Sequence, residues 1–108
     1  MTKPVTYIAP IKLASGITEA EFLQASQRFE TEFVSKQPGV LRREVIRKSE
    51  GNYADIVLFR SVEDAVDVIE KEQASEICKE FFSLMDMADM TEESSTEMGP
   101  FPSLAVYE

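Results

Sequence analysis

Three side chains that could take part in acid–base chemistry lie in segments with the pattern of β-strands. Asp55 stands among the apolar residues of the segment 53–60, and burial there would raise its pKa toward the range in which a carboxylate acts as a general base. Tyr7 and Tyr53 carry hydroxyls that can donate a hydrogen bond to a bound carbonyl or oxyanion. The alternative roles are structural: Asp55 can pair with an arginine or face water, and a buried tyrosine can simply pack.

A short basic run, comprising Arg42, Arg43, Arg47 and Lys48, interrupts an otherwise acidic chain. A planar guanidinium binds a carboxylate or phenolate well, so Arg42 and Arg43 are candidate substrate-binding residues. Alternatively, these arginines pair with acidic helices, with the acidic segment 86–102 or with Asp55, or they face solvent. The sequence leaves these alternatives open.

The chain has no histidine and a single cysteine, Cys78. It therefore lacks Ser-His-Asp and Cys-His arrangements, imidazole ligands for zinc or haem, and the cysteines of an iron–sulfur cluster. It also lacks the glycine-rich motifs that bind dinucleotides or phosphates. We expect no metal site and no cofactor, and we interpret Cys78 as a small buried hydrophobic residue.

Length and charge define the broad class of protein. The 108 residues, 44% of them hydrophobic, fit a single domain spanning 1–108 with one core. A formal net charge of −9 disfavours binding to nucleic acids and to anionic membranes. The sequence shows neither an apolar stretch long enough for a membrane span nor the pattern of a signal peptide, so we expect a cytoplasmic protein.

The first half of the sequence predicts a strand followed by a capped helix. Apolar residues at alternating positions predict a strand over 5–13. Thr18 and Glu21 form a capping box that starts a helix, which should end before Gln37 because a proline and a glycine follow. The apolar stripe of this helix consists of Phe22, Ala25, Phe29 and Phe33.

A turn signal at 49–52 predicts a β-hairpin. Its two strands are 40–48 and 53–60. In the register that a tight turn gives, Arg42 and Asp55 share one face of the hairpin, whereas Arg43 lies on the other. A slip of one residue would exchange the two faces.

The second half of the sequence predicts two more helices and a last strand. Ser61 caps a helix that runs to about residue 73, and Ser75 starts another. The stripe of the first of these helices consists of Val62, Ala65, Val66 and Ile69. The acidic segment 86–102 is interpreted as an arm or lid, and 103–107 as a strand. The order β-α-β-β-α(α)-β predicts a ferredoxin-like α+β fold with a four-stranded antiparallel sheet.

The expected helices can cover only one face of this sheet. The other face would present apolar residues to water, which soluble monomers rarely tolerate over a large area. We therefore expect a homodimer whose sheets pack face to face around a twofold axis. In this arrangement the segment 86–102 would carry residues 104–107 to the edge of the partner's sheet.

Two segments resemble the antibiotic-biosynthesis-monooxygenase-like (ABM-like) family. Gln37–Arg43, with the sequence QPGVLRR, resembles the Pro-Gly start of that family's second strand. Tyr53–Ala65, YADIVLFRSVEDA, resembles its third strand and the Trp-x-Ser-x-Glu-x-Ala start of its second helix. The resemblance covers roughly 5–86. It implies a dimeric α+β barrel with a pocket between each sheet and its helices.

The resemblance implies several activities rather than one. Some ABM-like domains are cofactor-independent oxygenases of polycyclic phenols, some degrade haem, some are isomerases or dehydrochlorinases, and many have no known activity. Oxygenase members commonly carry tryptophan where this chain has Phe59 and an asparagine on the first strand or helix, whereas the only asparagine here is Asn52, in the turn. Haem-degrading members use a histidine, which this chain lacks.

Two functions remain open from the sequence. The chain could be a cofactor-independent monooxygenase-like enzyme whose Phe29 and Phe59 help to hold a flat aromatic or polyketide-type metabolite, with Tyr7 or Tyr53, Asp55 and an arginine acting on it. Alternatively, it is a non-catalytic binding or accessory dimer for a hydrophobic small molecule. A cavity with convergent polar groups favours the enzyme, and a closed core favours the second function.

Overall fold

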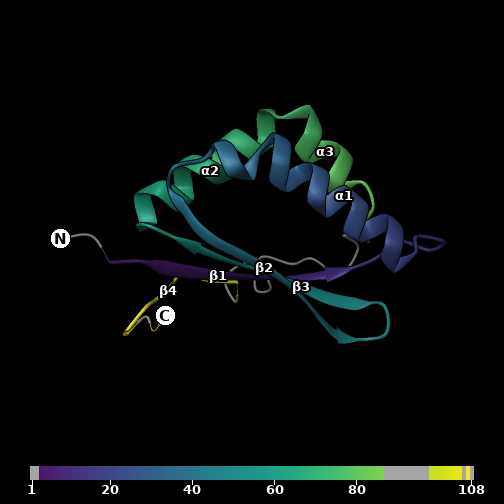
Figure 1. Ribbon diagram of the computed structural model, residues 1–108, viewed down its shortest axis with the longest axis horizontal. Coiled ribbons are helices and arrows are strands. Elements are labelled where there is room, and N and C mark those ends of the chain that lie inside the picture. The colour runs from purple at the N-terminus through teal and green to yellow at the C-terminus, as the bar shows by residue number, and fades with distance from the viewer. Residues whose placement is uncertain (1–2, 87–97, 106, 108) are drawn as a thin grey trace.

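A layer of helices packs on one face of a four-stranded sheet in the computed structural model, which describes residues 3–86, 98–105 and 107 (Figure 1). The strands are β1 (Val5–Lys12), β2 (Val40–Ser49), β3 (Asn52–Phe59) and β4 (Phe101–Pro102). The helices are α1 (Glu19–Glu32), α2 (Val62–Ala74) and α3 (Glu76–Phe82), and a 3-10 turn, η1 (Val34–Lys36), follows α1. Most of the expected acidic arm, residues 87–97, lies outside the described part of the chain.

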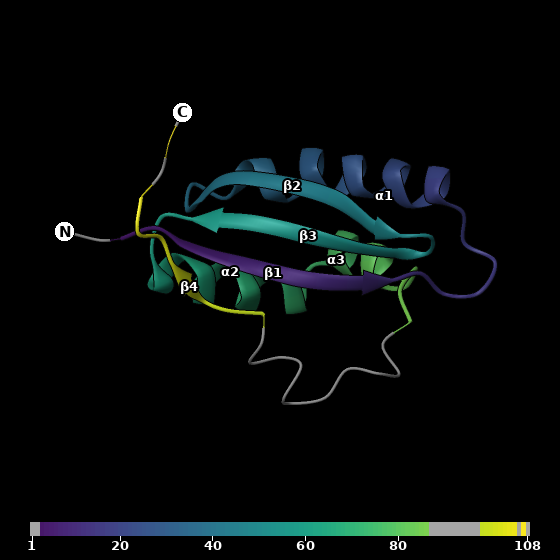
Figure 2. The ribbon, with the colours of Figure 1, turned by 90° about the horizontal axis from the view of Figure 1, so that it is seen from below.

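The strand order β2-β3-β1-β4, with each pair antiparallel, confirms the predicted ferredoxin-like topology (Figure 2). Both capped helix starts are also confirmed. The Thr18 hydroxyl accepts a hydrogen bond from the Glu21 backbone at 3.1 Å, and the Ser61 hydroxyl accepts one from the Asp64 backbone at 3.1 Å. Such caps satisfy backbone donors that have no partner inside the helix. They fix where α1 and α2 begin over the sheet.

The core lies between the helices and the sheet. Phe22, Phe29 and Phe33 of the predicted α1 stripe are buried, and Ala25 packs against them. The expected stripe of α2 is only partly right. Val62 and Val66 are 43% and 47% exposed, because the face turned toward the sheet has the i, i+3, i+4, i+7 spacing of a core-facing helix and starts at Ala65. That face consists of Ala65, Val68, Ile69 and Glu72.

The expected hairpin register is wrong by one residue. The tight turn is present, with Ser49 opposite Asn52, but the register shifts before it and places Arg47 opposite Tyr53. Lys48 is therefore an extra residue on β2, a β-bulge, and such a bulge turns the following side chains to the other face. A second register shift occurs near Leu41 at the other end of the strand.

The bulge determines which arginine side chain faces the helices and which faces away from them. Arg43 lies on the helix-facing side of the sheet together with Asp55, and its side chain is only 6% exposed. Arg42 lies on the open side, where its side chain is 70% exposed and binds Glu44 at 2.8 Å. The expected shared face of Arg42 and Asp55 is thus replaced by a shared face of Arg43 and Asp55.

The last strand is shorter and begins earlier than expected. Phe101 and Pro102 pair with Thr6 and Val5 of the chain's own β1, whereas Ser103–Ala105 and Tyr107 are not in a strand. Backbone hydrogen bonds from Ile8 to Met98 and from Ser103 to Pro4 hold this segment against β1. The alternating pattern predicted a strand here, but Leu104 and Tyr107 are 98% and 91% exposed.

None of the described helices covers the other face of the sheet (Figure 1). This face carries the exposed Ile8 and the half-buried Ile46, Ile56 and Leu58. The same face carries the exposed ion pair of Arg42 and Glu44. The predicted homodimer would cover the apolar residues of this face. Within the described ranges, no helix is both long enough and apolar enough to cross a membrane.

Candidate functional site

A cavity of about 550 Å³ lies between the sheet and the helices, within the usual range of small-molecule sites. Its walls are mainly apolar and come from all three helices, from β1, β2 and β3, and from Met98 and Gly99. Its aromatic side chains are Tyr7, Phe29, Phe59, Phe81 and Phe82. Apart from the Tyr7 hydroxyl, the polar side chains that reach it belong to Arg43, Asp55 and Glu72.

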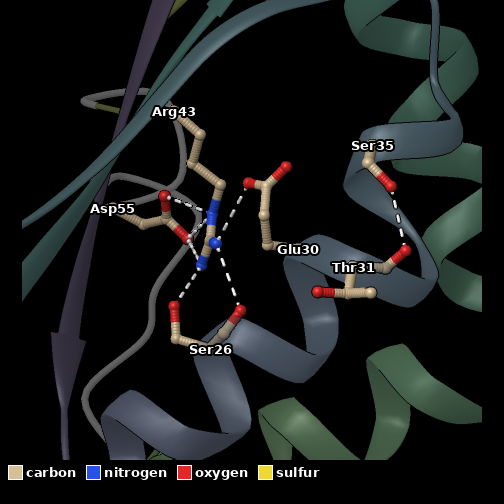
Figure 3. Close-up of polar contacts among 6 residues, drawn as sticks. All are labelled: Ser26, Glu30, Thr31, Ser35, Arg43 and Asp55. Carbon is tan, nitrogen blue, oxygen red and sulfur yellow. Dashed lines mark hydrogen bonds and ion pairs between the residues drawn. The ribbon is translucent and has the colours of Figure 1, made fainter.

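Arg43 and Asp55, on neighbouring strands, form a buried ion pair at the wall of the cavity (Figure 3). Arg43 Nε lies 3.0 Å from each carboxylate oxygen of Asp55, and Nη2 lies 2.9 Å from Oδ2. A buried pair of this kind is stable only when its remaining polar atoms are also satisfied.

The rest of the Arg43 guanidinium is held by α1. Nη2 donates to the Ser26 hydroxyl at 2.9 Å, and Nη1 donates to the Ser26 carbonyl at 3.4 Å and lies 3.5 Å from Glu30 Oε1 (Figure 3). The guanidinium carbon also lies 5.0 Å from the centre of the Phe29 ring and 5.7 Å from that of Phe81, within the range of cation–π attraction. Every nitrogen of Arg43 is therefore engaged inside the protein.

Burial raises the pKa of the Asp55 carboxyl, and the charge and hydrogen bonds of Arg43 oppose that rise. Because N–H groups of Arg43 point at both of its oxygens, Asp55 acts as an ionised acceptor in this pair. Its side chain is 10% exposed. Asp55 thus places a fixed negative charge at the wall of the cavity.

Glu72, which the sequence analysis did not single out, supplies a second carboxyl group to the cavity from α2. Burial raises its pKa from 4.5 to about 7, the charge of Asp55 adds to this rise, and Arg43 opposes it. Among the residues that the structure describes, the Glu72 carboxyl has no hydrogen-bond or ion-pair partner. A carboxyl group with such a pKa can accept and return a proton near neutral pH.

Tyr7, on β1, contributes a hydroxyl that is likewise without a hydrogen-bond partner in the described residues. Its ring packs edge-on against Phe59 with centroids 5.5 Å apart, and burial raises the pKa of its hydroxyl. It therefore stays protonated at neutral pH, able to donate to a ligand oxygen.

The cavity brings together some of the predicted site residues and leaves out others. Five line it: Tyr7, Phe29, Arg43, Asp55 and Phe59. Tyr53 does not line the cavity: its ring is buried against Phe22, and its hydroxyl donates to Glu19 Oε1 at 3.1 Å. Arg42 lies on the open face of the sheet, away from the cavity.

Cys78 is buried and has no disulfide partner, in agreement with its interpretation as a core residue. In the ranges that the structure covers, no three or more Asp, Glu, His or Cys side chains gather in a way that could hold a metal ion. The candidate site thus consists of an apolar cavity, an internally satisfied ion pair and two polar side chains that have no partner among the described residues.

The protein is an α+β domain with the ferredoxin-like strand order and a cavity beneath its helices. Within that class, its fold is that of an ABM-like domain. SnoaB, a cofactor-independent oxygenase from Streptomyces nogalater studied as a mutant, superposes with a TM-score of 0.66 at 17% identity, covering 83% of this chain and 97% of SnoaB.

Two further solved structures agree with this fold. A protein from Caulobacter crescentus, provisionally described as an antibiotic biosynthesis monooxygenase, gives a TM-score of 0.58 at 19% identity and covers 77% of this chain and 76% of its own. A counterpart from Bordetella bronchiseptica, described in the same way, gives 0.57 at 22% identity, with 77% and 82% covered. Neither the protein-family models nor the curated proteins contain a match to the sequence. The likeness at these identities concerns the fold.

Proposed function

We propose that the chain is a cofactor-independent monooxygenase-like enzyme that acts on a flat aromatic or polyketide-type metabolite. The observation that carries this proposal is the cavity of about 550 Å³. The Glu72 carboxyl and the Tyr7 hydroxyl, neither with a partner in the described part of the chain, open into it from opposite layers of the fold. Its aromatic walls suit a planar ring system. The fold shared with SnoaB, a cofactor-independent oxygenase, supports the same reaction class.

Glu72 is assigned the role of general base. It removes a proton from an acidic ring CH2 group next to a phenol or carbonyl, and the resulting carbanion is delocalised over the rings of the substrate. Tyr7 donates a hydrogen bond to the substrate oxygen on which the negative charge gathers. Asp55 raises the proton affinity of Glu72 through its charge, while Arg43 holds Asp55 in place.

The substrate carbanion then reduces O2 without a cofactor. One electron passes from the carbanion to O2, and the two radicals combine to form a carbon-bound peroxide, which takes up the proton held by Glu72. Loss of the second C–H proton to Glu72 breaks the O–O bond and expels hydroxide, which takes up this proton from Glu72 and leaves as water. The net change is CH2 + O2 → C=O + H2O. The apolar walls reduce the contact of the carbanion with bulk water during these steps.

The test is oxygen consumption with a tricyclic phenolic substrate such as 1,8-dihydroxyanthrone, measured against the uncatalysed rate in buffer. We expect about one O2 per quinone formed and one ¹⁸O atom from ¹⁸O2 in the product. Replacing a general base typically costs about 10²- to 10⁴-fold in rate, and Glu72→Gln should lower kcat within that range. Glu70→Gln, on the exposed side of the same helix, is the matched control and should keep wild-type kcat.

Two results would contradict the oxygenase proposal. One is tight binding of the anthrone with oxygen uptake no faster than in buffer, which would favour the non-catalytic binding dimer. The other is equal loss of kcat in Glu72→Gln and Glu70→Gln, which would assign the effect to the charge of α2 rather than to a base in the cavity.

A further inference from the structure

Arg43 cannot serve as an anion-binding arm in this cavity. A guanidinium has five N–H groups and no acceptor. Those of Arg43 are directed at Asp55, at the hydroxyl and carbonyl of Ser26 and at Glu30, and the side chain is 6% exposed. A ligand carboxylate would have to displace Asp55, leaving that carboxylate buried without its partner. Loss of one partner of a buried ion pair is strongly unfavourable.

The groups that remain available to a ligand are mainly acceptors. The Glu72 carboxyl and the Tyr7 hydroxyl have no partner within the described residues. Asp55 has lone pairs left beyond those that bind Arg43. When Glu72 is ionised, the cavity lining holds two carboxylates and one guanidinium, so its own charge is negative.

An anionic ligand would therefore add a further negative charge to a mainly apolar cavity whose lining is already negatively charged. Removing a carboxylate from water without providing a cationic partner is costly, and nearby carboxylates add repulsion that water screens poorly inside a protein. A neutral ligand with an O–H or N–H group adds no charge to the cavity, and it can donate a hydrogen bond to the Glu72 carboxylate.

We propose that this cavity selects flat ligands that are uncharged and carry a hydrogen-bond donor, and that it rejects analogues with a carboxylate or phosphate group. Glu72 is the residue that makes the distinction, and Tyr7 binds an oxygen elsewhere on the same ligand. This inference deepens the proposed function, on which it rests for the planar substrate. It also has a consequence for the reaction: transfer of a proton from a neutral substrate to Glu72 leaves the total charge of the occupied cavity unchanged.

The test uses three fluorescent probes with the same two-ring skeleton: 2-naphthol is a neutral donor, methyl 2-naphthoate a neutral acceptor and 2-naphthoate an anion. Dissociation constants are measured on the intact chain by fluorescence titration near pH 8, where a carboxyl with a pKa of about 7 is mostly ionised. We expect 2-naphthol to bind at least about tenfold more tightly than 2-naphthoate, with the ester between them.

Two variants of α2 test whether Glu72 is the residue that favours the neutral probe over the anionic one. Glu72→Gln, shown to be folded by circular dichroism, should bind 2-naphthol less tightly and 2-naphthoate more tightly than the wild type does. The ratio of the dissociation constant of 2-naphthoate to that of 2-naphthol should fall to about threefold or less. Glu70→Gln, which removes one charge from the exposed side of α2, should keep the wild-type ratio. A ratio that falls equally in both variants would assign it to the overall charge and overturn the role of Glu72.

The remaining outcomes separate this inference from the oxygenase proposal. Binding of 2-naphthoate as tight as that of 2-naphthol overturns the selectivity, whatever the oxygen measurements give. Selective binding without oxygen uptake by the anthrone supports the inference and removes the oxygenase proposal. If none of the three probes binds at the limit of its solubility, the cavity is not a ligand site and both fall.

Discussion

Replacing Glu72 by glutamine should make the folded protein more stable at alkaline pH. The carboxyl has a pKa of about 7 in the fold against 4.5 for the free group. At about 1.4 kcal/mol for each pKa unit, ionising Glu72 costs the folded state about 3 kcal/mol more than the unfolded chain. Glutamine has nearly the same shape and never ionises, so the variant avoids this cost.

The sign of the effect follows from the raised pKa. Below pH 4.5 the carboxyl is protonated in both states, so its titration contributes no difference. Between pH 4.5 and about 7 the unfolded chain releases the proton and the folded chain keeps it, so wild-type stability falls as the pH rises. Above that window both states are ionised and the full cost remains.

The assay is urea unfolding followed by circular dichroism at fixed protein concentration, at about pH 5 and about pH 8.5. The free energy of unfolding of Glu72→Gln minus that of the wild type should grow by about 2–3 kcal/mol between the two conditions. Glu70→Gln controls for the loss of one negative charge from α2. A change below about 1 kcal/mol, or an equal change in Glu70→Gln, would refute the reasoning that burial in the cavity controls Glu72.

Three further predictions concern the core, the ion pair and the assembly. Arg43→Met should lower the free energy of unfolding by about 3–5 kcal/mol, because it leaves Asp55 buried and unpaired. Adding Asp55→Leu to this variant should recover part of the loss. If the double variant instead loses as much stability as the two single variants together, the prediction is wrong. Phe29→Ala should cost about 3–5 kcal/mol in the same urea assay, and a loss below about 1 kcal/mol would remove Phe29 from the core. Light scattering at micromolar concentration should give about twice the chain mass, because the open sheet face carries Ile8, Ile46, Ile56 and Leu58 and stable interfaces bury more than about 1,200 Å². A monomer mass would contradict the homodimer.

Local signals predicted the elements well because their causes are local. The capping box at Thr18, the serine cap at Ser61 and the turn at 49–52 each depend on a few consecutive residues, and all are present in the structure. The predicted register of the hairpin was wrong because it depends on contacts with residues distant in the sequence. The bulge at Lys48 places Arg43 against Asp55 of the hairpin and also against Ser26 and Glu30 of α1, and the α1 contacts are not encoded in the hairpin sequence.

The candidate site was predicted in part for the same reason. Tyr7 and Asp55 were recognisable as polar groups inside apolar strands, and both line the cavity. Glu72 was missed because it lies in the last turn of a helix rich in exposed acidic residues. The available signal was its position four residues after Val68 and seven after Ala65, on the buried side of α2. A carboxylate on the apolar stripe of an otherwise acidic helix is easily overlooked.

The bulge at Lys48 gives the isolated β2–β3 hairpin two competing ways to fold. The bulge-free pairing is compatible with the same tight turn, but it would send Arg43 to the side of the sheet away from Asp55 and α1. The hydrogen bonds from Arg43 to Asp55 and Ser26 exist only in the bulged pairing. Arg43 and Asp55 both lie within the hairpin, so their ion pair itself stabilises the bulged register, and α1 adds the hydrogen bonds of Ser26. The electrostatics of the site and the alignment of the two strands are therefore coupled.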